Sequence, residues 1–183
     1  MRLSLYEFEH GVETIGGNRV VYDVAADVAH FGAAVVEGHA LVWQVDEDEH
    51  DAEGALLSAR VQLDPYADWI VRCDRIDFPL AGIAYRHVHP GPGIRYLLAG
   101  EIEIETAGRT TAYGRGGAWF ESGPEPVLAH ASRHLETSFV RVLLLPAEWA
   151  GKRTIRYVDP ADADLPRLQR ASVYFDHPIA LPR

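Results

Sequence analysis

Two histidines, His87 and His89, have the types and spacing that point most directly to chemistry, because they lie two positions apart in the segment Tyr85–His89. If this segment is a β-strand, alternate side chains project to the same face, and both imidazoles can converge on one ion. Imidazole nitrogen is a common ligand of divalent metals. His130 is the candidate third ligand. The alternative for the pair is a metal-free polar pocket.

A carboxylate and a phenol are candidates to act beside this pair. Glu121 lies two positions after Trp119 on an expected strand, so both side chains are expected to face the pocket. Glu121 could then be a general base, a metal ligand or a hydrogen-bond acceptor, against the alternative of a rim glutamate paired with an arginine. By alternation Tyr85 shares a face with the histidines, which makes it the best-placed donor to a ligand. Glu121 and Tyr85 are therefore the candidate catalytic residues.

Three further side chains flank the expected site and are candidates to line a substrate pocket: Arg95, Tyr96 and Trp119. Arg95 could neutralise a carboxylate on a substrate, because a guanidinium pairs well with that group. For each of the three, packing inside a sandwich or a surface ion pair is the alternative.

The elements that must position these residues are short alternating or apolar stretches separated by Gly/Pro turns. This pattern is typical of an antiparallel sandwich or barrel, and it occupies about residues 55–146. In Glu101–Thr106 the strict alternation places isoleucines on one face and carboxylates on the other. The expected strands are Ala55–Leu63, Ile70–Phe78, Tyr85–His89, Ile94–Ala99, Glu101–Thr106, Ala118–Glu121, Val127–Ala131 and Ser138–Leu145.

We expect one domain, 1–183, in which this core carries an N-terminal extension, 1–54, and a C-terminal extension, 147–183. The first extension has possible strands at Arg19–Tyr22 and Ala40–Val45 and a helical turn or loop at Val24–Phe31. In the second we expect a short helix after Pro146, another capped by Asp159, and a strand at Ser172–Phe175. Terminal strands often cover a free sheet edge, their own or a partner's, so a homodimer is expected.

Composition excludes several classes of function. The 183-residue chain has a formal net charge of -10, which would repel a phosphate backbone, so no nucleic-acid partner is expected. No uninterrupted apolar run has membrane-spanning length, and no membrane partner is expected. Cys73 is the single cysteine, which fits a reducing, cytoplasmic compartment. The acidic run at 46–53 is expected to be a solvated loop, with metal collection as the minor alternative.

The run from Gly82 to Gly108, which contains the histidine pair, the turn Pro90–Gly93 and two alternating strands, resembles the first motif of the cupin superfamily. The segment Gly114–Pro124 is similar to the start of the second motif. The resemblance implies an all-β fold, a double-stranded β-helix or jelly-roll barrel, with a pocket between its sheets where a metal usually sits.

The sequence also departs from the cupin pattern. The glutamate that usually follows the second histidine is missing, and Pro92, Gly93 and Ile94 occupy that stretch. The histidine of the second motif falls on Pro126 or Val127, with His130 somewhat later. The His-x-His-x-Gly-Pro-Gly run and the Phe-Glu-Ser segment are locally similar to β-diketone-cleaving dioxygenases, which use three histidines.

The resemblance implies a metal-dependent enzyme that acts on a small organic molecule. An oxygenase using Fe(II) is the leading hypothesis, with Zn, Mn or Ni as other candidate ions. A metal-assisted isomerase or cyclase would need the same residues. A non-catalytic cupin that binds a small molecule is the hypothesis from a different class, and the missing glutamate favours it.

Overall fold

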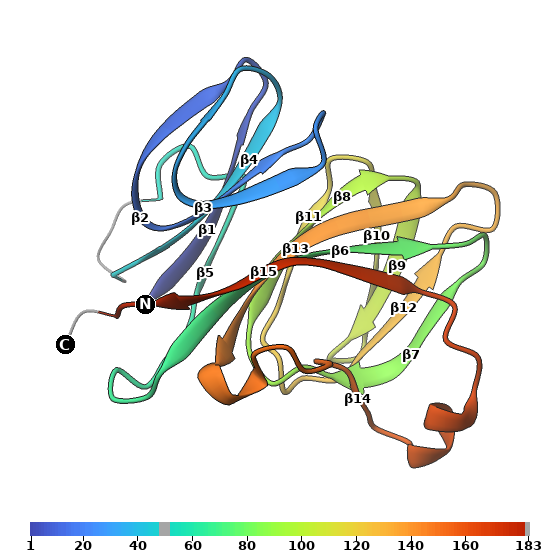
Figure 1. The fold of residues 1–183 in the computed structure, drawn as a ribbon. Coiled ribbons are helices and arrows are strands. Elements are labelled where there is room, and N and C mark those ends of the chain that lie inside the picture. The colour runs from blue at the N-terminus through green and yellow to red at the C-terminus, as the bar shows by residue number, and fades with distance from the viewer. Residues whose placement is uncertain (48–51, 182–183) are drawn as a thin grey trace.

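The computed structural model describes residues 1–47 and 52–181, and within these ranges the chain is built almost entirely of antiparallel strands (Figure 1). Half of the acidic run lies at 48–51, outside the described residues, so its expected loop is not tested. No helix in the described part of the chain is long and apolar enough to cross a membrane.

Three five-stranded sheets make up the molecule. The first, sheet A, has the order β3 (Val28–Val36), β2 (Val12–Asp23), β4 (Ala40–Asp46), β1 (Arg2–Phe8) and β5 (Leu57–Arg60). Sheet B has the order β11 (Ala118–Glu121), β8 (Gly93–Ala99), β13 (Thr137–Pro146), β6 (Trp69–Phe78) and β15 (Arg170–Ile179). Sheet C has the order β10 (Arg109–Gly114), β9 (Glu101–Thr106), β12 (Val127–Ala131), β7 (Ile83–Val88) and β14 (Arg156–Tyr157).

Sheets B and C form the barrel, and its interior is closed by apolar side chains from both. Leu97 and Phe139 of sheet B are buried in one cluster with Ile102, Ile104 and Ala129 of sheet C. These positions alternate with outward residues along each strand, as the sequence pattern predicts. The expected all-β barrel is confirmed.

The N-terminal extension is a sheet of its own that packs on the outer face of sheet B. Leu5 and Trp43 of sheet A share a core with Val71, Ile94 and others of sheet B. The Trp43 indole also donates a hydrogen bond to the Ile94 carbonyl, 3.2 Å away, which ties the two sheets together. In Figure 1 this sheet is the blue lobe beside the barrel.

Several boundaries differ from the expectation. The first strand expected for the barrel lies in sheet A, where β5 pairs with β1, so the barrel begins at β6. The segment Val24–Phe31 is a tight turn followed by β3, because the Asp23 carboxylate accepts hydrogen bonds from the Ala25 and Ala26 amides. Strands β1, β3, β10 and β14 were not expected.

The C-terminal extension returns along the barrel. Short 3-10 helices occur at Ala147–Trp149 and Pro160–Asp164, and Asp159 caps the second as expected. The expected terminal strand is part of β15, which pairs with β6 and covers that edge of sheet B within its own chain. The homodimer stays a prediction.

Candidate functional site

The histidine pair lies inside the barrel. His87 is the penultimate residue of β7 and His89 comes directly after the strand, and both side chains are buried. Their Nε2 atoms are 3.2 Å apart. His87 Nδ1 lies 2.7 Å from the Tyr85 carbonyl oxygen, and His89 Nδ1 lies 3.1 Å from that of Thr154. A carbonyl oxygen only accepts, so each Nδ1 carries the hydrogen and each Nε2 presents a lone pair.

Both imidazoles are held in the neutral form. Burial lowers the pKa of His87, against an opposing effect of the Glu121 charge. Burial lowers the pKa of His89 much further, and the positive charges of Arg141 and Arg95 add to that effect. Two neutral nitrogen lone pairs therefore face each other at close range, which is an arrangement that a cation can bridge.

Tyr85 does not share the face of the histidines. Strand β12 pairs Val127 with His87 but Ala129 with Ala84, so β7 carries an extra residue, a β-bulge, between Ala84 and His87. The bulge reverses the alternation, and Ala84 and His87 both face the interior cavity, whose lining does not include Tyr85. This corrects the expected catalytic role of the Tyr85 side chain. Its carbonyl instead orients His87.

A row of charged side chains crosses the inner face of sheet B beside the pair. Register places Asp74 opposite Arg141, Arg141 opposite Arg95, and Arg95 opposite Trp119. Arg141 donates two hydrogen bonds to the Asp74 carboxylate, at 2.6 and 2.9 Å, and its Nη1 lies 3.3 Å from His89 Nε2. The sequence did not lead us to expect this row, although the charged Arg141 in the middle of the apolar strand β13 could have indicated it.

Glu121 faces the interior together with Trp119, as expected. The Trp119 indole donates to Glu121 Oε1 at 2.8 Å. Glu121 Oε2 lies 2.6 Å from Arg95 Nη2 and 3.7 Å from His89 Nε2. The contact with Arg95 lacks the alignment of a hydrogen bond, so this buried oxygen has no hydrogen-bond partner in the described part of the chain. Glu121 is therefore paired with an arginine, but inside the barrel and not at its rim.

Arg95 is fully buried, and burial lowers its pKa to about 10 despite the nearby Glu121 charge. Tyr96, one position later, points to the opposite face of β8. It packs in the core between sheets A and B, and its hydroxyl donates to Glu7. Tyr96 therefore does not line the barrel pocket, which corrects that expectation.

His130 does not lie beside the histidine pair either. Along β12, Val127, Ala129 and Ala131 are buried while His130 is exposed, because it occupies the alternate, outward position. The expectation that His130 is a third metal ligand is therefore wrong for this fold. At the second-motif position itself the inward side chain is Val127, which cannot coordinate a metal.

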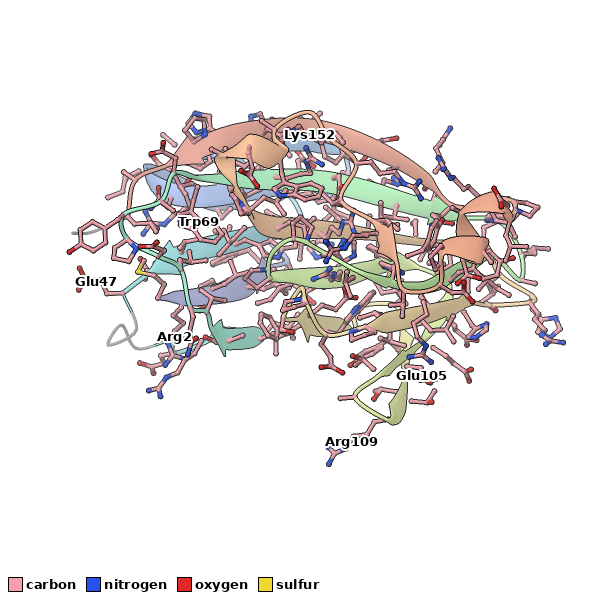
Figure 2. All side chains as sticks on the ribbon, turned by 90° about the horizontal axis from the view of Figure 1, so that it is seen from below. Arg2, Glu47, Trp69, Glu105, Arg109 and Lys152 are labelled. Carbon is pink, nitrogen blue, oxygen red and sulfur yellow. The ribbon has the colours of Figure 1, made fainter. Side chains whose placement is uncertain are left out.

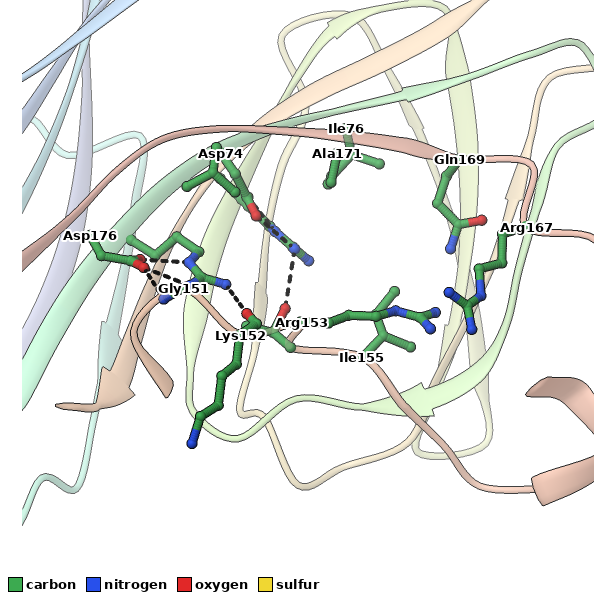
Figure 3. A pocket seen from close by; sticks show the side chains of 14 residues that line it. Asp74, Ile76, Gly151, Lys152, Arg153, Ile155, Arg167, Gln169, Ala171 and Asp176 are labelled. Carbon is green, nitrogen blue, oxygen red and sulfur yellow. Dashed lines mark hydrogen bonds and ion pairs between the residues drawn. The ribbon is translucent and has the colours of Figure 1, made fainter. Parts of the chain in front are cut away.

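The space around the pair is divided in two. An interior cavity of about 30 Å³ is lined by His87, His89, Trp119, Glu121 and Arg141 among others. A larger cavity of about 390 Å³ lies outside it and is lined by β15 and the segment 151–155 (Figure 3). Lys152 of this segment is labelled in Figure 2. The two share lining residues, Ile76, Arg141, Ile155 and Gln169. The inner space suits an ion or a water molecule, and the outer one suits a small organic molecule.

The residues present fit a divalent ion in part. Two atoms bound to one ion at about 2.1 Å each are separated by at most about 4.2 Å, and both the 3.2 Å between the imidazoles and the 3.7 Å from His89 to Glu121 satisfy this. Glu121 Oε2 is also a buried oxygen without a hydrogen-bond partner. Within residues 1–47 and 52–181, however, no three His, Cys, Asp or Glu side chains form a ready-made metal cluster. Glu121 would have to shift to complete the site.

Comparisons with known proteins give matches to solved structures only. No protein-family model and no curated protein matches the chain. An RmlC-like cupin from Shewanella frigidimarina NCIMB 400 is 12% identical, with a TM-score of 0.39, over 49% of this chain and 94% of that one. The polyketide cyclase RemF from Streptomyces resistomycificus is 21% identical, with a TM-score of 0.40, over 56% and 72%. A deletion mutant of Bacillus subtilis oxalate decarboxylase OxdC is 9% identical, with a TM-score of 0.46, over 90% and 70%.

The observed barrel agrees with the fold that the cupin resemblance of the sequence implies. The histidine pair sits at the end of β7, the Gly/Pro turn leads into β8, and the two antiparallel sheets B and C enclose the pair. The structure is an all-β barrel of the kind that the cupin resemblance implies, with a further five-stranded sheet packed on its outside.

Proposed function

We propose that the barrel is the active site of a metal-dependent enzyme that acts on a small organic molecule. The observation that supports this best is the approach of two unprotonated Nε2 atoms, His87 and His89, to 3.2 Å inside a buried cavity. Without a cation between them, two lone pairs at this distance would repel each other. The hydrogen bonds from each Nδ1 to a backbone carbonyl are the usual support of metal-binding histidines.

Glu121 is the proposed third ligand. It is the nearest carboxylate to His89, and its Oε2 atom is buried without a hydrogen-bond partner among the described residues. Two histidines and one carboxylate suit Fe(II), with open positions for a substrate and O₂, and an oxygenase is the reaction class we propose first. The same set with Zn, Mn or Ni would support an isomerase or cyclase.

The chain's own residues have distinct parts in this proposal. The Trp119 indole holds Glu121 by a hydrogen bond to Oε1, and Arg95 forms an ion pair with Oε2. Thr154 holds His89 through its carbonyl oxygen and approaches Arg141 through its hydroxyl at 3.5 Å. The small interior volume means that a substrate would enter from the larger outer cavity.

A binding protein without a metal is the second candidate, and one observation favours it. Arg141 Nη1 lies 3.3 Å from His89 Nε2, so a guanidinium already donates toward the lone pair that an ion would need. In this alternative the barrel binds its ligand through Arg141 and the histidines alone.

Metal analysis of purified protein separates the two candidates. The protein is equilibrated in turn with Fe(II) and with Zn, Mn and Ni, freed of excess ion, and measured by plasma mass spectrometry. We expect one ion per chain in the wild type, and loss of that ion in both His87→Ala and His89→Ala. His130→Ala is the matched control, because its exposed imidazole lies outside the barrel, and it should keep the ion. No bound metal in the wild type, or equal metal in His87→Ala, would rule out the enzyme proposal.

A further inference from the structure

The larger cavity has a charge pattern that differs from that of the whole chain. The chain carries a formal net charge of -10, yet this cavity is lined by five basic side chains and two acidic ones. The two acids are already paired. Asp74 accepts two hydrogen bonds from Arg141, and Asp176 accepts two from Arg72, at 2.6 and 2.7 Å.

Two of the remaining cations face the cavity without a carboxylate. Arg153 contacts the Tyr157 hydroxyl at 3.0 Å and lies over its ring, and Arg167 comes from the segment that precedes β15. Neither has an ion pair in the described ranges 1–47 and 52–181. In Figure 3 the two guanidinium groups point into the same region, whereas Lys152 extends away from it.

The other walls of the cavity are apolar. Beside the two arginines, the cavity is lined by Ile76 of β6, Ile155 of the segment 151–155, and Ala171 and Val173 of β15. A cavity of about 390 Å³ lies within the usual range for small organic ligands. Unpaired guanidinium groups beside apolar walls suit a molecule with an oxyanion at one end and an apolar body at the other.

The position of the cavity determines how such a molecule would be oriented relative to the histidine pair. Ile76, Arg141, Ile155 and Gln169 line both the outer and the inner space, so the outer cavity adjoins the histidine pair. A ligand whose anionic group is held by Arg153 and Arg167 could extend its apolar body past Ile155 toward the barrel interior.

We propose that Arg153 and Arg167 bind the carboxylate or phosphate group of an amphipathic organic anion, and that the proposed enzyme takes its substrate from this chemical class. That this anion is a substrate rests on the proposed function. Binding of the anion itself does not require a metal. A carboxylate and a phosphate share the oxyanion chemistry, and the experiment below distinguishes them.

Calorimetric titration of metal-free wild-type protein at low ionic strength tests the proposal. The probes are 3-phenylpropionate, phenyl phosphate and the neutral 3-phenylpropionamide. We expect one of the two anions to bind at least about tenfold more tightly than the amide, since a charge-assisted hydrogen bond contributes about 1.5–3 kcal/mol. The tighter anion identifies the carboxylate or the phosphate as the group recognised.

Arg153→Gln and Arg167→Gln should each weaken binding of that anion about tenfold and leave the amide unchanged. Arg170→Gln is the matched control. Arg170 is an exposed arginine three residues from Arg167, it pairs with Asp77, and it does not line the cavity. Equal binding of anion and amide, no anion binding at millimolar concentration, or an equal loss in Arg170→Gln would overturn the proposal.

Metal content separates this proposal from the proposed function. Both arginine variants should keep the metal of the wild type, because neither arginine contacts the histidine pair. Loss of anion binding with the metal retained supports the anion site, whereas a wild type that binds the anion but no metal overturns only the enzyme proposal.

Discussion

Arg141 and Arg95 lie directly opposite each other on the neighbouring strands β13 and β8, and both side chains are buried inside the barrel. Like charges opposite each other destabilise a sheet. Here each arginine has its own carboxylate, Asp74 for Arg141 and Glu121 for Arg95. The four charges sum to zero. The positive charge beside the histidine pair is therefore balanced within one row of side chains.

Asp74→Asn should destabilise the protein strongly. The variant leaves the buried Arg141 without its ion pair, and removal of one partner of a buried pair costs about 3–5 kcal/mol. Urea denaturation followed by circular dichroism measures the free energy of unfolding. The control is Asp77→Asn, whose more exposed carboxylate pairs with Arg75 and Arg170, and which should cost about 1 kcal/mol or less.

A double variant tests whether the unpaired Arg141 causes the loss of stability in Asp74→Asn. Replacing both partners, as in Asp74→Leu with Arg141→Met, leaves no unpaired charge and should recover most of the stability lost in Asp74→Asn. If the double variant is as unstable as the single one, an unpaired Arg141 is not the reason.

Gly91→Ala should prevent the Gly/Pro turn from packing. A Cβ on Gly91 would lie 1.9 Å from the Leu144 carbonyl oxygen, which belongs to backbone and cannot rotate away. The Gly123 carbonyl that accepts from the His89 amide lies against the same turn. We expect a loss of about 3 kcal/mol in the free energy of unfolding.

The control for this glycine is Gly114→Ala. Nothing lies within 4 Å of a Cβ at Gly114, so the change should stay within about 0.5 kcal/mol by the same urea measurement. A Gly91→Ala protein as stable as the control would show that the close approach is not required.

Wherever the strands are regular, sequence periodicity correctly predicted which side chains face the pocket. The two-residue spacings of His87 with His89 and of Trp119 with Glu121 correctly place each pair on one face. Periodicity failed for Tyr85 because the bulge in β7 shifts the alternation by one residue, and a bulge has no reliable signature in one sequence. Arg95 and Tyr96 are consecutive, so alternation allows only one of them to face the barrel.

The remaining partners of the site depend on the pairing of distant strands. Asp74 and Arg141 are 67 residues apart, and only their register in sheet B shows that they form one ion pair. Thr154 comes from the C-terminal extension, whose path over the barrel no local pattern predicts. Likewise, only the pairing of β5 with β1 assigns that strand to sheet A.

Cys73 should be unreactive in the native protein. It is fully buried between sheets A and B, and burial raises the pKa of its thiol well above the usual value, with a further contribution from Asp74. Because the thiolate is the reactive form, we expect modification by a disulfide reagent to be on the order of 100-fold or more slower than in guanidinium chloride. Rapid stoichiometric labelling of the folded protein at pH 8 would contradict this burial.

Alkaline pH should weaken the contact between sheet A and β15 through Tyr22. Its hydroxyl donates to Asp27, which also accepts from Tyr174 and pairs with Arg75 at 3.2 Å. Burial raises the pKa of Tyr22 to about 12, and the hydrogen bond to Asp27 adds to the effect. The unfolded chain loses the phenol proton near pH 10, while the folded protein keeps it.

The sign of the pH dependence follows from this difference. The stabilisation linked to Tyr22 is fully present below pH 10 and is lost as the pH rises from 10 to about 12, because the unfolded state then binds fewer protons than the folded one. Melting temperatures measured from pH 9 to 11.5 should therefore fall. In Tyr22→Phe the fall should be shallower, although the variant starts lower at pH 9 because Asp27 has lost a donor. The same slope in both proteins would assign the alkaline loss to other groups.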